Sequence, residues 1–103
     1  MRIEVVGERT ISQQARAYAE YRVFAALTQC TEADKVRRVR VLLSPVSRGS
    51  GCVDIACTVT VALDGLESFR IRTTGDHTYA AINRAVERIR TNAPAGTADC
   101  IPV

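Results

Sequence analysis

Hydrophobic and polar residues alternate along four short segments of the chain, and this alternation predicts four β-strands. The segments span residues 2–6, 35–43, 52–63 and 67–74. Successive side chains of a strand point to opposite faces, so each segment would bury one face and expose the other. The side chains expected to face inward are Ile3, Val5, Val39, Val41, Leu43, Val53, Ile55, Cys57, Val59, Val61, Leu63, Phe69, Ile71 and Thr73.

Two further segments repeat their apolar residues with the period of an α-helix. The first runs from Gln13 to Thr28 and follows Ser12, whose hydroxyl can cap a helix N-terminus. The second lies within residues 75–90, with Asp76 at the expected N-cap position. The expected buried stripes are Ala15, Ala19, Val23 and Ala26 or Leu27 in the first helix, and Tyr79, Ile82, Val86 and Ile89 in the second.

Residues typical of turns separate these segments. The Pro, Ser and Gly residues of segment 44–51 predict a loop, and Asp64-Gly65 is typical of a two-residue hairpin turn. We expect one domain over residues 1–91. Residues 92–103 contain two prolines and show no periodicity, which predicts a flexible C-terminal tail.

The order of the elements is therefore β-α-β-β-β-α, and it predicts an α+β two-layer sandwich. The first two strands would be parallel neighbours joined by a right-handed crossover, and the last three would form an antiparallel meander. Each strand has one apolar face and each helix has one apolar stripe. Both helices would therefore pack on the same face of a four-stranded mixed sheet and leave the other face exposed to solvent.

The chain carries a formal net charge of +3, and thirteen of its fourteen basic residues are arginine. Codon usage in a genome rich in G and C explains this bias without reference to function. Recognition of phosphate explains it through the planar guanidinium group, which binds oxyanions with two parallel hydrogen bonds. The placement of the arginines has to decide between these explanations.

One set of arginines falls on the predicted solvent face of the sheet, among Thr58 and Thr60, with Asp54 and Glu4 as the opposing acids. A row of this kind suits a phosphate backbone. Exposed strand faces also carry charge for solubility and to block edge pairing, so both interpretations stay open. The sheet set consists of Arg38, Arg40, Arg70 and Arg72.

A second set lies on the helices, which side by side would present one composite basic strip, partly neutralised by Glu20 and Glu87. Arg48, in the predicted loop, would add a further phosphate contact. Aromatic residues are too few to form a platform that stacks unpaired bases, so RNA binding would rest on phosphates and shape. The helix set consists of Arg16, Arg22, Arg84 and Arg88.

The residue types argue against an enzyme. His77 is the only histidine, and Cys30, Cys52, Cys57 and Cys100 contain no CxxC pair. No nucleophile motif or phosphate-cradling glycine loop occurs, so we expect no catalytic residue, metal, cofactor or small-molecule substrate. No apolar run approaches the ~18 residues of a membrane span, and the first residues do not resemble a signal peptide, which predicts a cytoplasmic protein with no membrane partner.

Two sequence motifs resemble one known family. The segment YAAIN (79–83) resembles D-M-Y-A-A-I-D in the last helix of the ribosome hibernation-promoting factor and sigma modulation protein family. The pattern S-x-x-A-R-x-Y-A (12–19) is similar to that family's T-D-A-L-R-x-Y-V in the first helix. The predicted element order also agrees with the family's architecture, which is like that of double-stranded-RNA-binding domains.

The resemblance implies a small factor that binds the small ribosomal subunit, occupies the channel of messenger and transfer RNA, and blocks initiation. Basic residues would grip the ribosomal RNA, and by position these are the four arginines of the helix set. The alternative is a non-enzymatic protein-interaction module of the same fold that pairs through a sheet edge. Whether the chain is a monomer or a weak dimer stays open.

Overall fold

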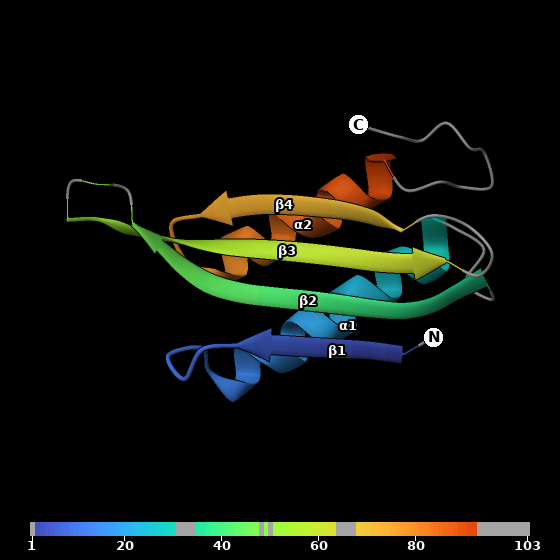
Figure 1. Ribbon diagram of the computed structural model, residues 1–103, viewed down its shortest axis with the longest axis horizontal. Coiled ribbons are helices and arrows are strands. Elements are labelled where there is room, and N and C mark those ends of the chain that lie inside the picture. The colour runs from blue at the N-terminus through green and yellow to red at the C-terminus, as the bar shows by residue number, and fades with distance from the viewer. Residues whose placement is uncertain (1, 31–34, 48, 50, 64–67, 93–103) are drawn as a thin grey trace.

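The computed structural model describes residues 2–30, 35–47, 49, 51–63 and 68–92 (Figure 1). It contains six elements in the predicted order. They are β1 (Arg2–Gly7), α1 (Gln13–Cys30), β2 (Val36–Ser47), β3 (Val53–Leu63), β4 (Phe69–Gly75) and α2 (Thr78–Asn92). The predicted Asp64-Gly65 turn, Arg48 and residues 93–103 of the predicted tail lie outside the described residues.

The four strands form one mixed sheet in the order β1-β2-β3-β4. The β1 and β2 strands are parallel, whereas β2, β3 and β4 are antiparallel neighbours. Both helices lie on the same side of the sheet and run side by side in the same direction (Figure 1). The predicted α+β two-layer sandwich is therefore confirmed. Among the described residues, no helix is long and apolar enough to cross a membrane.

Strand register aligns the buried side chains into rows beneath the helices. Val41 pairs with Val59, which pairs with Ile71, and Leu43 pairs with Cys57 in the next row. These side chains are buried, as is every residue of the predicted α1 stripe. In α2 the predicted stripe is buried at its three aliphatic positions, while Tyr79 remains 39% exposed. The period-2 and period-3.6 patterns thus identified most of the core.

The predicted loop 44–51 is wrong over its first half, because β2 continues to Ser47. Pro45 pairs with Ile55 of β3 although proline cannot donate a ladder hydrogen bond. The β1–β2 pairing ends at Gly7 and Leu43, so β2 is an edge strand at Pro45. On an edge, the missing N–H leaves no partner unsatisfied, and proline is tolerated there.

The first residues of β3 and β2 also differ from the prediction. The β3 strand begins at Val53, so Cys52 lies before it. In β2 the register shifts between Val36 and Arg38, which leaves Arg37 as an extra residue. A bulge of this kind changes the inward–outward alternation by one position. It explains why Val36 is buried although an even alternation from Val39 would place it outside.

Burial controls the ionisation of Cys57, which faces the helices from β3. Desolvation raises the pKa of its thiol from 9.0 to about 12. The unfolded chain then releases this proton near pH 9, while the folded chain keeps it. Stability from this group is complete below pH 9.0 and is lost as the pH rises toward 12.

We therefore expect unfolding free energy to fall by up to about 1.4 kcal/mol per pH unit above the unfolded pKa of Cys57. Urea unfolding at a series of alkaline pH values measures this slope. The Cys57→Ala variant should show a shallower slope, because other titrating groups are common to both proteins. Parallel slopes would show that the thiol does not carry this pH dependence.

Candidate nucleic-acid interface

The open face of the sheet carries the four arginines of the sheet set. All are exposed and alternate with buried residues that face the helices. Arg40 pairs with Thr60, which in turn pairs with Arg70. The two predicted threonines therefore separate the arginines of β2 from those of β4.

Arg2 adds a fifth arginine to this face, and sequence reasoning overlooked it. It pairs with Arg38 at the start of β1 and is exposed. The alternation of β1, with Ile3 and Val5 facing inward, was the signal that could have identified it. Glu4 also lies on this face, in register with Arg40, as predicted.

The guanidinium groups of the sheet set have no protein partner among the described residues. Within the part of the chain that the structure describes, no hydrogen bond or ion pair holds any of the four. Their long side chains are therefore available to a ligand, and a phosphate bound there would displace water rather than a protein contact.

Two arginines of the helix set have structural contacts instead. Arg16 is half-buried, and its Nη2 donates hydrogen bonds to the backbone oxygens of Gly7 (3.0 Å) and Glu8 (3.1 Å) at the end of β1. Arg22 is half-buried at the side of α1, with its guanidinium carbon 6.0 Å from the centroid of the Tyr18 ring. Its Nε is buried and has no hydrogen-bond partner in the described parts of the chain.

Tyr18 contacts both helices, and its ring is the one over which Arg22 lies. Its hydroxyl donates a 2.6 Å hydrogen bond to Oδ1 of Asn83. Its ring packs edge-on against Tyr79, with 5.0 Å between the ring centroids and 65° between the planes. Three residues of the two family-like motifs thus meet at the helix–helix contact.

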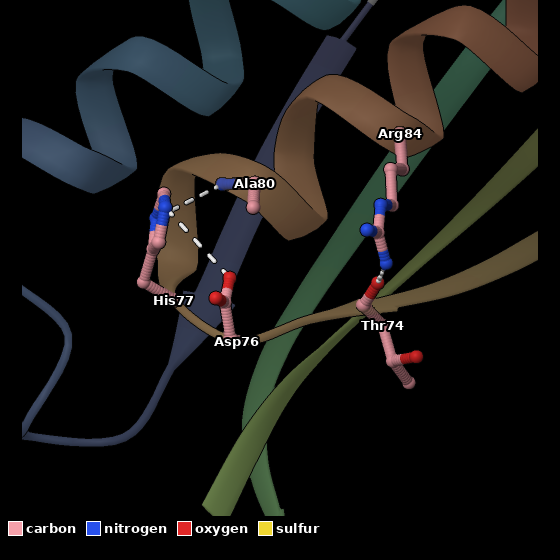
Figure 2. Close-up of polar contacts among 5 residues, drawn as sticks. All are labelled: Thr74, Asp76, His77, Ala80 and Arg84. Carbon is pink, nitrogen blue, oxygen red and sulfur yellow. Dashed lines mark hydrogen bonds and ion pairs between the residues drawn. The ribbon is translucent and has the colours of Figure 1, made fainter.

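The other two arginines of the helix set line a groove at the β4 edge. Nη1 of Arg84 donates a 2.7 Å hydrogen bond to the backbone oxygen of Thr74 (Figure 2). The groove has a volume of about 490 Å³. Its lining residues are Arg72, Thr73, Thr74, Arg84, Glu87 and Arg88.

The predicted composite strip across the two helices is therefore wrong. Arg16 is tied to the end of β1, whereas Arg84 is tied to β4, and β1 and β4 are opposite edges of the sheet. The groove instead joins Arg84 and Arg88 to Arg72, which belongs to the sheet set. The sequence patterns of strand and helix could not reveal this junction, because it depends on how α2 packs against β4.

The close approach of α2 to β4 rests on two residues of that strand. The buried Thr73 hydroxyl donates a 2.9 Å hydrogen bond to the backbone oxygen of Ala81. Gly75 has no side chain at the point of contact, where a Cβ would lie 2.6 Å from the backbone nitrogen of Ala81. These contacts position the first turns of α2 beside the strand, and with them Arg84.

His77 caps the N-terminus of α2, where Asp76 was predicted. The helix begins at Thr78, and Nδ1 of His77 accepts a 3.2 Å hydrogen bond from the backbone N–H of Ala80 (Figure 2). Its backbone oxygen accepts from the N–H of Ala81 (3.1 Å). The carboxylate of Asp76 lies 3.8 Å from Nε2 of His77, one residue too early to cap the helix. In α1 the predicted cap is confirmed, because Oγ of Ser12 accepts from the N–H of Ala15 (3.0 Å).

His77→Ala is expected to lower the unfolding free energy by about 1 kcal/mol, because one orphan backbone donor loses its partner. His77→Asp should retain the stability, since aspartate is a strong N-cap and its charge suits a helix N-terminus. Urea unfolding of both variants checks this. Asp76→Ala is the matched control, and a larger loss there than in His77→Ala would contradict the assignment.

Comparison with solved structures identifies proteins of the same fold. No family model matches the sequence, and no curated protein matches it. The structure is similar to that of a ribosomal subunit interface protein from Coxiella burnetii, with a TM-score of 0.68 and 15% sequence identity. The match covers 88% of this chain and 91% of that chain. At this identity it establishes a shared fold across nearly the whole of both chains.

Proposed function

We propose that this protein is a ribosome-associated factor that binds ribosomal RNA of the small subunit through its basic surface and restrains translation. The observation that supports it most directly is the fold shared with a ribosomal subunit interface protein. The family-like motifs in both helices point the same way, and their tyrosines and asparagine make the contact between α1 and α2. The protein would act without catalysis, in the cytoplasm, where ribosomes work.

Electrostatics supports RNA as the partner. Exposed arginines of the sheet set have no protein partner among the described residues, and Arg84 and Arg88 border an open groove. Guanidinium groups bind phosphate oxygens with two hydrogen bonds, and each neutralised phosphate releases counterions. Such contacts position a protein on RNA without reading its sequence, which suits ribosomal RNA of fixed shape.

Sedimentation through a sucrose cushion with purified small subunits tests this proposal. The wild-type protein should appear in the pellet at moderate salt, and its complete absence would refute the proposal. Two quadruple alanine variants then separate the faces: one lacks the four arginines of the sheet set, and the other lacks the four of the helix set. We expect the sheet variant to lose binding more strongly. Among the described residues no protein contact holds its guanidinium groups, whereas those of Arg16 and Arg84 are hydrogen-bonded to the backbone.

The alternative, pairing with another protein through a sheet edge, meets an obstacle at β4. The guanidinium of Arg84 already donates a hydrogen bond to the backbone oxygen of Thr74. An added strand would need this acceptor for its own backbone hydrogen bonds. A concentration-dependent dimer that does not sediment with small subunits would favour this alternative over ribosome binding. Analytical ultracentrifugation of the protein alone measures it.

A further inference from the structure

The arginines of the sheet and of α2 form one continuous band rather than two patches. The band starts at the neighbouring arginines of β1 and β2, crosses the open face of the sheet, and reaches the β4 edge. There it continues through the groove onto α2. We name it the basic band, and its members are Arg2, Arg38, Arg40, Arg70, Arg72, Arg84 and Arg88.

Strand register places the band diagonally across the sheet. Arg38 is in register with Ala62, and Arg72 is in register with Thr58, four residues earlier on β3. Strand geometry then separates Arg38 and Arg72 by roughly 17 Å, with Arg40 and Arg70 between them. Thr60 lies between these two arginines, and its side chain is shorter than theirs. A ligand can therefore lie over Thr60 and contact the arginine on either side.

The band turns around the edge of the sheet. Arg72 lies on the open face at β4, yet it lines the same groove as Arg84 and Arg88 of α2. The helix lies on the opposite side of the sheet from the open face (Figure 1). A ligand that contacts the whole band must therefore bend around β4 from one layer of the molecule to the other.

This bend selects the physical form of the ligand. A DNA duplex is stiff over ~150 base pairs, so it can follow the flat part of the band on the sheet but cannot bend around β4 within a few base pairs. A single strand bends freely at each nucleotide, and it presents its phosphates in succession. Acidic groups are few beside the seven arginines, which fits a polyanion: among the described residues these are Glu4 and Asp54 on the open face of the sheet and Glu87 in the groove.

We propose that the basic band binds the sugar-phosphate backbone of one extended, single-stranded RNA segment that crosses the sheet and wraps around β4. The identity of the ligand as RNA rests on the proposed function. Arg16 and Arg22 lie off the band, on the contacts with β1 and Tyr18 described above. Binding is independent of base sequence, since the band offers guanidinium groups and hydroxyls but no stacked aromatic residues.

Fluorescence anisotropy with a labelled oligouridylate of about ten nucleotides tests the band. Two double variants remove equal charge from its two ends: Arg38→Ala with Arg40→Ala, and Arg84→Ala with Arg88→Ala. Each should weaken binding about 20-fold at 0.1 M salt, because each removes two phosphate contacts. Arg9→Ala with Arg90→Ala removes the same charge from exposed positions that do not belong to the band. This charge-matched control should change affinity less than about twofold, because it removes no phosphate contact of the band.

A second test introduces one negative charge and leaves Arg84 in place. Its result does not depend on the hydrogen bond between Arg84 and Thr74. Thr60→Glu places a carboxylate in the middle of the band and should weaken binding about fivefold. Thr28→Glu, on the exposed side of α1, is its matched control and should leave affinity unchanged. Equal losses in the Thr60 and Thr28 variants would overturn the band, as would a loss confined to one end of it.

Three further outcomes complete the test, and the last two separate this inference from the proposed function. A duplex of the same length that competes as well as the single strand would overturn the wrapped, single-stranded mode. Failure to bind oligouridylate, with intact sedimentation on small subunits, would overturn the band and leave the proposed function standing. Binding of oligouridylate by the band, without sedimentation, would support the band and refute the ribosomal function.

Discussion

Ile82→Ala is expected to lower the free energy of unfolding by about 2–5 kcal/mol. The side chain of Ile82 is fully buried on α2, in the layer between the helix and the sheet. The substitution loses the favourable free energy of burying the removed methyl and methylene groups, and it leaves a cavity beneath the helix. Domains of this size have about 5–15 kcal/mol of stability in total, so the loss is a large fraction of what holds the fold.

Urea unfolding of the wild type and the variant measures the difference directly. Tyr21→Ala serves as the control, because it removes a larger side chain from a helix position that is 69% exposed. We expect that change to stay within about 0.5 kcal/mol. If the two substitutions cost the same, Ile82 would not be in the close-packed core, and the placement of α2 against the sheet would be wrong.

The core could be predicted from the sequence because burial follows the period of each element. Val39 and Val41 alternate with arginines in β2, and Val59 and Val61 alternate with threonines in β3. With one face apolar in every strand, only one side of the sheet can accept the helices. The element order and the layers follow from this local information together with the rules of chain connection.

The predictions from sequence were wrong where the local structure depends on a neighbouring strand or helix. Pro45 is typical of a turn in sequence, yet it lies in β2 because β1 has already ended beside it. The helix cap differed by one residue because the chain first completes β4 at Gly75, and His77 rather than Asp76 then reaches the first turn. Neither fact is visible in a window of sequence.

The candidate interface was predicted in part for the same reason. The sheet set follows from alternation alone, and the structure places all four side chains on the open face. The relation between the sheet and helix sets depends on Thr73 and Gly75, which bring α2 against β4. Only the packed structure shows that Arg72 shares a groove with Arg84 and that Arg16 lies at the other edge.

Loss of the four sheet arginines is expected to reduce strongly the salt dependence of binding to small ribosomal subunits. Each phosphate neutralised in single-stranded nucleic acid contributes about −0.7 to the slope of log affinity against log salt concentration. The wild-type slope should therefore lie near −5 if all seven arginines of the basic band make contact. The sheet variant should lose about 3 of these units of slope, because four contacts are gone.

The wild-type protein should consequently lose about a thousandfold in affinity between roughly 50 and 200 mM salt, and the sheet variant about twentyfold. Sedimentation titrations at a series of salt concentrations measure both slopes, with the Arg9→Ala, Arg90→Ala protein as the charge-matched control. The slope, unlike the affinity at one salt concentration, counts phosphate contacts and is insensitive to apolar ones. Binding with a flat slope in all three proteins would exclude the arginines as the contact and would point to the uncharged surface of α1, where Tyr21 and Phe24 are exposed.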